Sequence, residues 1–393
     1  MKKYILYGSS ILFSRGLEYI VLLVAPLYLV KESYGELEFY KKIIELGAAF
    51  LTFGLPTLIL SYPRSAESKK YFTFMSLIFI TFLAILLFPF LIGSNYFFLL
   101  IPIYFHSVFF NNGIVPPFVL TYKGSSFASF YKIIVSALFY AIILGSIFLS
   151  SKPEFAFVYV NYVLLPVLMT YCIYYFYQNG ILKSKLSKYW LLFKKLLINS
   201  FTIVVSNFAN MMFLYTDIMI IKILSTNANT DIADYSFSLN ISNALILIPL
   251  TLVQVDIEKL KTNKKYGTIL NKKIIIFVLL LSILLLLLFV LLTQTLFENY
   301  KSTFIVFCIL ITAKIFQSLS VLYGAQIIIG KFYKENLIIN TIALLSNVVI
   351  SYFLYYKIGL IGVAMASLFT LIIRYVMLVI LNKKSQHTNN NET

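Results

Sequence analysis

The 393-residue sequence has few charged residues, few histidines and few cysteines. Charged side chains make up 12% of the chain, against about 25% in an average soluble domain. Two histidines are too few for a metal cluster or histidine-based catalysis, and Cys172 and Cys308 lie in apolar stretches that form no disulfide framework. Phosphate-binding loops and catalytic triads are missing as well. We therefore expect no soluble enzyme, no bound metal and no cofactor.

Hydrophobic residues make up 60% of the chain, and aromatic residues 17%. A membrane-spanning helix needs about 20 mostly apolar residues, and no alternation typical of barrel strands is present. We predict an all-α integral membrane protein with twelve transmembrane helices in two six-helix bundles. The predicted spans are residues 8–30, 38–62, 71–92, 96–120, 133–151, 155–177, 196–221, 233–255, 274–293, 302–324, 336–356 and 359–381.

The basic residues predict the orientation of these spans. Alternate loops, together with both termini, collect 21 of the 32 lysines and arginines. Cytoplasmic loops carry such an excess, so we predict that both termini are cytoplasmic. The net charge of +17 is then mainly a topology signal, and we expect no binding to nucleic acid.

Two long basic loops suggest where the chain divides. We predict an N-terminal six-helix bundle over residues 1–178 and a basic cytoplasmic linker over 179–195. A C-terminal six-helix bundle follows over 196–381, and a polar cytoplasmic tail over 382–393. Duplicated bundles with a substrate site between them are a recurring plan of transporters.

Ionisable residues inside the first two spans require a physical reason, because each costs roughly 2.5–3.5 kcal/mol at mid-span. Arg15 and Glu18 are three residues apart and therefore neighbours on one helix. Two interpretations stay open: a structural pair that fastens this span to another, or an Arg15 that lines a cavity and meets an anionic substrate. In the second span, Glu38, Lys41, Lys42 and Glu45 are expected to neutralise one another near the outer interface.

A polar stripe follows the seventh predicted span. Asn199, Ser206, Asn210 and Asp217 are seven, four and seven residues apart, which places them on one face of a continuous helix. Such a stripe faces protein or water rather than lipid. Packing against another helix and lining a cavity are both open, and Lys222 is a candidate partner for Asp217.

Lys314 is the most informative charge in the C-terminal half. It lies halfway along the tenth predicted span, Gln317 and Ser318 follow one turn later, and no acidic residue lies within one turn. Its partner must therefore come from another helix or from the substrate. Arg374 lies nearer a cytoplasmic end, where snorkelling is an alternative. Because Arg15, Lys314 and Arg374 outnumber the deep carboxylates Glu18 and Asp217, we predict an anionic cargo.

Four segments of the sequence carry a resemblance to known membrane proteins. They are residues 213–220 (FLYTDIMI), 233–236 (ADYS) with Pro249, 32–35 (ESYG) leading to 53–56 (FGLP), and 357–366 (KIGLIGVAMA). These segments resemble the polysaccharide-exporter branch of the multidrug/oligosaccharidyl-lipid/polysaccharide flippase superfamily. Within it, the sequence most resembles Wzx-type O-antigen and capsule repeat-unit flippases, and the resemblance covers essentially the whole chain.

The resemblance implies a flippase of the bacterial cytoplasmic membrane that works by alternating access. Its cargo would be an oligosaccharide repeat unit on undecaprenyl pyrophosphate, and its partners membrane lipid, a coupling ion (H⁺ or Na⁺) and polysaccharide polymerase machinery. Arg15, Lys314 and Arg374 match the cations that hold the substrate in such a cavity. The polar residues expected to line that cavity are Glu18, Asn199, Ser206, Asn210, Asp217 and Gln317.

Two other functions stay open. A cation-coupled drug antiporter of the same superfamily would need acidic cavity residues in the N-terminal half, where Glu18 is offset by Arg15. A polysaccharide polymerase would need a large outer loop bearing catalytic residues, and every predicted outer loop is short. A lipid II flippase usually has two more spans than this sequence predicts. The flippase for repeat units is therefore the leading hypothesis, and we expect no enzymatic activity.

Overall fold

A computed structural model describes most of the chain, and every regular element in it is helical. The described residues are 2–61, 65–110, 113–181, 187–199, 201–256, 259–260, 266–330 and 332–391. The chain divides into two compact units, residues 1–208 and 209–393, with the division inside one helix. The boundaries predicted at residues 178 and 195 stay a prediction.

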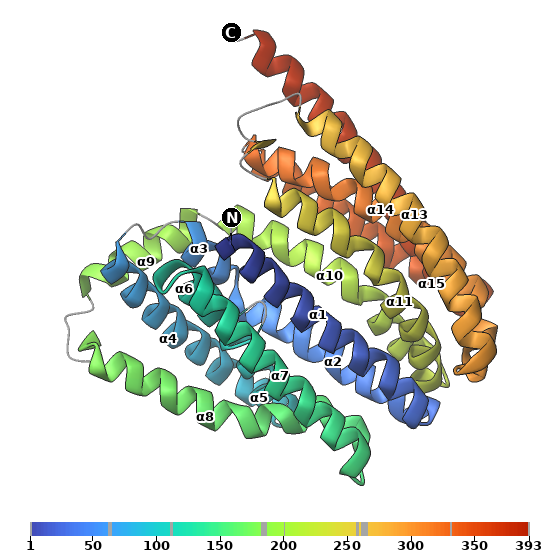
Figure 1. The fold of residues 1–393 in the computed structure, drawn as a ribbon, viewed down its shortest axis with the longest axis horizontal. Helices are drawn as coiled ribbons and strands as arrows, with labels where there is room; N and C mark the ends of the chain where they lie inside the picture. The colour runs from blue at the N-terminus through green and yellow to red at the C-terminus, as the bar shows by residue number, and fades with distance from the viewer. Residues whose placement is uncertain are drawn as a thin grey trace. The chain divides into compact units, whose positions relative to one another are not determined.

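The first unit is a bundle of helices of unequal length (Figure 1). Helix α1 packs against α7, and α2 packs against α5. The left-handed backbone of Phe53 (φ 44°) and Gly54 (φ 71°) ends α2, so the chain turns directly into α3. The elements are α1 (Lys2–Tyr28), α2 (Lys31–Thr52), α3 (Leu55–Ser61), α4 (Ala66–Leu91), η1 (Phe97–Leu99), α5 (Leu100–Val108), α6 (Val115–Tyr122), α7 (Ser125–Leu149), η2 (Pro153–Phe155), α8 (Ala156–Gln178) and α9 (Ser187–Asn199).

The fourth predicted span, residues 96–120, is not one helix. Helix α5 ends at Val108 and α6 begins at Val115, with two prolines in its first turn. Proline lacks the N–H that a continuous helix would need at these positions. The amide of Ile114 instead donates to the carbonyl of Ser107 at 3.2 Å, which closes the turn between the two helices.

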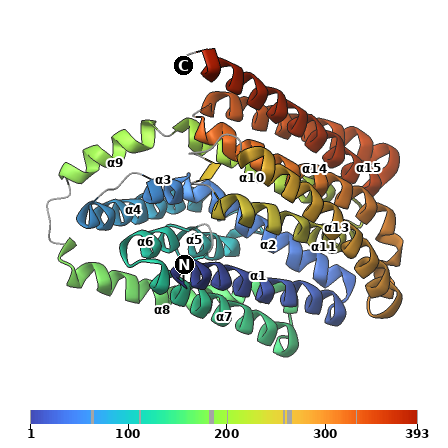
Figure 2. The same cartoon turned by 45° about the horizontal axis from the view of Figure 1, so that its top comes forward.

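The second unit is built around α14 and α15, which pack along each other, while α11 and α13 pack against α14 (Figure 2). Gly359 divides α15 into two helical halves, because its φ of 59° and ψ of −135° suit only glycine. The elements after α9 are α10 (Phe201–Leu224), which contains the division between the units, α11 (Ala228–Val255), α13 (Tyr266–Thr295), η4 (Glu298–Thr303), α14 (Phe304–Ile329) and α15 (Tyr333–Asn391).

Eight helical segments in the described part of the chain are long and apolar enough to cross a membrane. The segment in α13 has a mean hydropathy of 3.6, yet only 28% of it is buried within the protein. An apolar surface of this extent is stable against lipid rather than water. The chain is therefore a multi-pass membrane protein, whereas the count of twelve spans stays a prediction.

Candidate functional site

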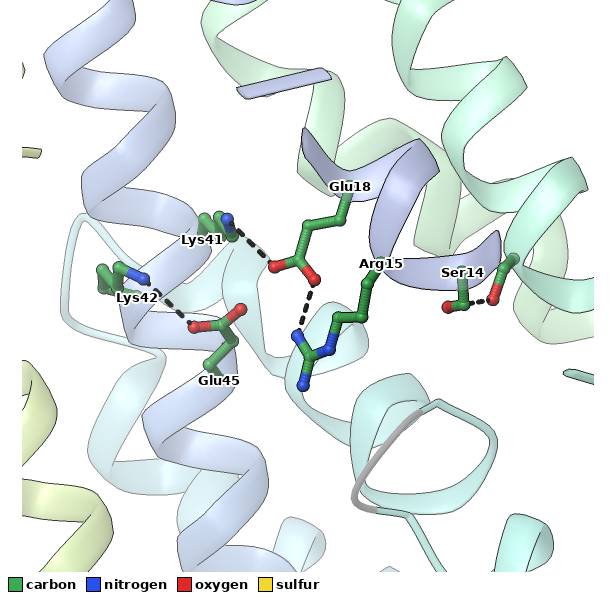
Figure 3. A network of polar contacts seen from close by, with 7 residues as sticks. Ser14, Arg15, Glu18, Lys41, Lys42 and Glu45 are labelled. Atoms are coloured by element: carbon green, nitrogen blue, oxygen red, sulfur yellow. Dashed lines mark hydrogen bonds and ion pairs between the residues drawn. The ribbon is translucent and has the colours of Figure 1, made fainter. Parts of the chain in front are cut away.

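The first unit contains a network of charged side chains on α1 and α2, in which Lys41 is buried and Arg15 is exposed (Figure 3). Arg15 on α1 contacts the Glu18 carboxylate through Nη1 at 2.6 Å. The other oxygen of Glu18 lies 3.6 Å from Nζ of Lys41 on α2. One carboxylate thus joins two cations from two helices, and the predicted Arg15–Glu18 pair is present.

The charges of the second predicted span do not simply neutralise one another. Lys42 pairs with Glu45 at 3.5 Å, but Lys41 reaches Glu18 on the neighbouring helix. Glu38 is fully buried, and neither of its carboxylate oxygens accepts a hydrogen bond from the residues that the structure describes. Lys41 is buried, and its contact with Glu18 on α1 is one that the expectation did not include.

We expect Glu18 to be the residue on which this network depends. Replacing it with glutamine should lower the free energy of unfolding by about 3 kcal/mol, because Lys41 would stay buried without its counterion. Asp256→Asn is the control, because its partner Lys259 is 64% exposed and stays hydrated when the ion pair is lost, so the free energy of unfolding should fall much less. Thermal unfolding in detergent measures both. Equal losses in the two variants would contradict a special role for Glu18.

The second unit is organised around the carboxylate of Asp217 on α10. The side-chain amide of Asn347 donates to Oδ1 at 2.9 Å, and the hydroxyl of Ser367 donates to Oδ2 at 2.6 Å. The hydroxyl of Tyr235 on α11 donates to Oδ2 as well. Asn347 and Ser367 lie on the two sides of the break in α15, so Asp217 ties both halves of α15 to α10 and α11.

Lys222 is not the partner of Asp217, contrary to the sequence-based expectation. Its Nζ donates to Oδ1 of Asn229 at 2.7 Å. Asp217 lies within the bundle with 5% of its surface exposed, where donors from α11 and α15 reach it instead.

Lys314 and Asp217 line the same small cavity, which α10, α11, α14 and α15 enclose. Ser367 completes its polar lining, and the remaining lining residues are Leu239, Leu310, Ala313 and Leu371. Lys314 is 5% exposed and donates to Oε1 of Gln317 at 2.9 Å. Two residues predicted separately therefore face one cavity, where a carboxylate and an ammonium group lie in apolar surroundings.

Arg374 extends this polar region along α14 and α15. Its Nε donates to Oδ1 of Asn340 at 3.0 Å, and its Nη1 donates to the hydroxyl of Ser320 at 3.1 Å. The Ser320 hydroxyl in turn donates to the backbone carbonyl of Gln317 at 2.6 Å. Among the described carboxylates, none lies within 4 Å of the guanidinium group. Arg374 is thus an inward-facing cation held only by neutral groups.

The predicted stripe on the seventh span is only partly placed. Asn199 is the last residue of α9, whereas Asp217 lies in α10, which begins at Phe201. Residue 200, between these two elements, lies outside the described residues, so one continuous helix over residues 196–221 stays a prediction. The side chains of Asn199, Ser206 and Asn210 lie outside the part of the chain that is described, so their cavity-lining role stays a prediction.

Sequence reasoning missed the residues that surround Asp217 and Arg374. A signal for two of them was present, because Asn336, Asn340, Asn347 and Ser351 are four, seven and four residues apart in one predicted span. The same one-face rule that was applied to the seventh span selects them. Within the described residues, no group of three His, Cys, Asp or Glu side chains lies close enough to hold a metal ion.

Comparison with known proteins identifies the fold. No family model and no curated protein matches the sequence. A solved structure of the lipid II flippase MurJ in an inward closed conformation matches over 96% of this chain and 87% of its own length, with a TM-score of 0.62 and 20% identity. A crystal structure of MATE in a straight conformation matches over 100% of this chain and 97% of its own, with a TM-score of 0.52 and 12% identity.

The chain therefore has an all-helical membrane fold of the MurJ and MATE type. This confirms the prediction of an all-helical membrane fold, whereas the twelve helices and the two six-helix bundles stay a prediction. The fold and the apolar helices indicate a multi-pass membrane protein. Each of its two units contains a network of polar and charged side chains.

Proposed function

We propose that this protein is a flippase that moves a lipid-linked oligosaccharide across the bacterial cytoplasmic membrane for the synthesis of surface polysaccharide. The observation that carries the proposal is the match of nearly the whole chain to the fold of a lipid II flippase. The proposed cargo is an undecaprenyl-pyrophosphate-linked repeat unit of O-antigen or capsule. Both termini would be cytoplasmic, and polysaccharide polymerase machinery would use the product.

Three cations, of which Lys314 is buried, Arg374 is half-buried and Arg15 is exposed, support an anionic cargo. A pyrophosphate–sugar head group cannot cross hydrocarbon unaided, because its charges and hydroxyls would lose their water. Arg15, Lys314 and Arg374 would offset that loss as the cargo passes. Arg374 suits this role best, because its hydrogen-bond partners Asn340 and Ser320 are neutral. A phosphate could replace them without leaving a buried carboxylate unpaired.

Asp217 supports coupling of transport to an ion. Its carboxylate lies beside Lys314 in one cavity and accepts hydrogen bonds from both halves of α15. Binding of H⁺ or Na⁺ there would change how strongly α10 holds α15, which is a physical route from an ion gradient to alternating access.

A cation-coupled antiporter of drugs or other small molecules is the second candidate. The likeness to MATE and the buried carboxylate of Glu38 favour it. The two functions differ in cargo charge: the antiporter predicts export of organic cations, and the flippase predicts movement of an anionic lipid head group.

A strain that lacks the gene tests the proposed function. We expect loss of surface polysaccharide and accumulation of lipid-linked repeat units on the cytoplasmic side of the membrane, measured by protection of the sugar from an external lectin. Restoring the gene should restore both. Normal polysaccharide together with increased sensitivity to cationic drugs would contradict the flippase and support the antiporter.

A further inference from the structure

Helix α9 carries an exposed face of mixed chemistry at one end of the first unit. Trp190, Leu191 and Ile198 are 47%, 70% and 62% exposed. Lys194 and Lys195 are exposed as well. At 100° per residue, these five positions fall within an arc of about 140°. Apolar and basic side chains therefore share one face of this short helix.

The opposite face of α9 packs against α4 of the bundle. Phe193 is 1% exposed, and its ring lies 5.2 Å from that of Phe72 and 5.9 Å from that of Phe79 on α4. Tyr189 stacks on Tyr71 at 4.0 Å. Because these contacts hold one face inward, the mixed face points away from the unit.

Neither water nor hydrocarbon alone suits that outer face. In water, three large apolar side chains would stay exposed, and in hydrocarbon two lysines would lose their hydration. The boundary between them satisfies both, since indole rings and lysine ammonium groups are favourable at the level of the lipid head groups. The composition of this face therefore indicates that α9 lies at the boundary between water and the membrane.

More cations gather where α4, α6 and α8 meet beside α9. Nζ of Lys70 lies 5.2 Å and Nζ of Lys123 5.4 Å from the centre of the Tyr122 ring. Lys70 donates to Oδ1 of Asn179 at 2.7 Å. Within the described residues, no carboxylate forms an ion pair with either lysine. Lys70 directly precedes Tyr71, which stacks on Tyr189, so Lys70 and Lys123 lie beside α9.

We propose that a rim formed by the outer face of α9 with Lys70 and Lys123 binds the head groups of anionic phospholipids. Lys194 and Lys195 meet the phosphates, while Trp190, Leu191 and Ile198 enter the upper acyl region. The inference concerns the surrounding bilayer, and it holds whether the cargo is a lipid-linked oligosaccharide or an organic cation.

Trp190 provides the probe, because it is the only tryptophan in the chain. The full chain is reconstituted in phosphatidylcholine vesicles with and without 30 mol% phosphatidylglycerol. We expect Trp190 fluorescence to be quenched by lipids brominated near the head of the acyl chain and not by aqueous iodide. Quenching by iodide, or by neither reagent, would overturn the proposal, because α9 would then lie in water or be covered by protein.

A charge variant tests the head-group preference. Lys194→Gln with Lys195→Gln should lower the enrichment of phosphatidylglycerol over phosphatidylcholine, measured by spin-labelled lipids, by about fivefold for each lysine. Lys152→Gln with Lys301→Gln removes the same charge elsewhere and should leave the enrichment unchanged. Equal effects in the two double variants, or none in the first, would overturn the assignment. Size-exclusion profiles check that each variant is folded.

Discussion

Replacing Asp217 with alanine should strongly destabilise the second unit. The change would leave the hydroxyls of Tyr235 and Ser367 and the amide of Asn347 without their acceptor in a buried site. Each such loss costs about 1–3 kcal/mol, so we expect the free energy of unfolding to fall by about 3 kcal/mol or more. Thermal unfolding in detergent measures it.

Two variants make this expectation specific. Asp217→Asn keeps an acceptor oxygen and the shape of the side chain, so it should retain most of the stability while transport is lost if Asp217 binds the coupling ion. Asp256→Ala removes a carboxylate whose partner Lys259 is largely exposed (64%), and it should cost under about 1 kcal/mol. If the alanine variant at 217 is as stable as the one at 256, the hydrogen bonds to Asp217 contribute little.

The sequence supports the fold class because hydropathy is a property of long segments. Runs of apolar residues predict helices, and the resemblance of residues 357–366 to an exporter motif includes Gly359, where α15 breaks. The break between Val108 and Val115 was missed, because a run of apolar residues has the same hydropathy whether one helix or two short helices cover it. Its position depends on local backbone hydrogen bonds, such as that from Ile114 to Ser107.

The sequence identified the charged residues of the candidate site but not the contacts that they make between helices. Arg15 and Glu18 are neighbours on one helix, so their pairing follows from spacing alone. The contacts of Lys41 with Glu18, and of Asp217 with Asn347 and Ser367, join residues far apart in the chain. Spacing along one helix carries no information about which face of a second helix it meets, so a tertiary structure is required to find them.

Arg374→Gln should separate transport from stability. Its guanidinium is bound by Asn340 and Ser320 and by no described carboxylate, so the substitution leaves no buried acid unpaired. Glutamine can still bond to one of these groups, and we expect the free energy of unfolding to change by less than about 1 kcal/mol. Transport should fall by roughly ten- to a hundredfold, because one or two charge-assisted hydrogen bonds to a phosphate are lost.

Movement of lipid-linked oligosaccharide into the outer leaflet of proteoliposomes measures this effect. The control is Lys301→Gln, which removes an exposed cation of the second unit. Lys314→Gln should also lower transport, but with a loss of stability, because Lys314 shares its cavity with Asp217. Normal transport by the Arg374 variant would remove Arg374 from the substrate path. A loss of transport as large in the Lys301 variant would mean that net charge, rather than a bound phosphate, explains the effect.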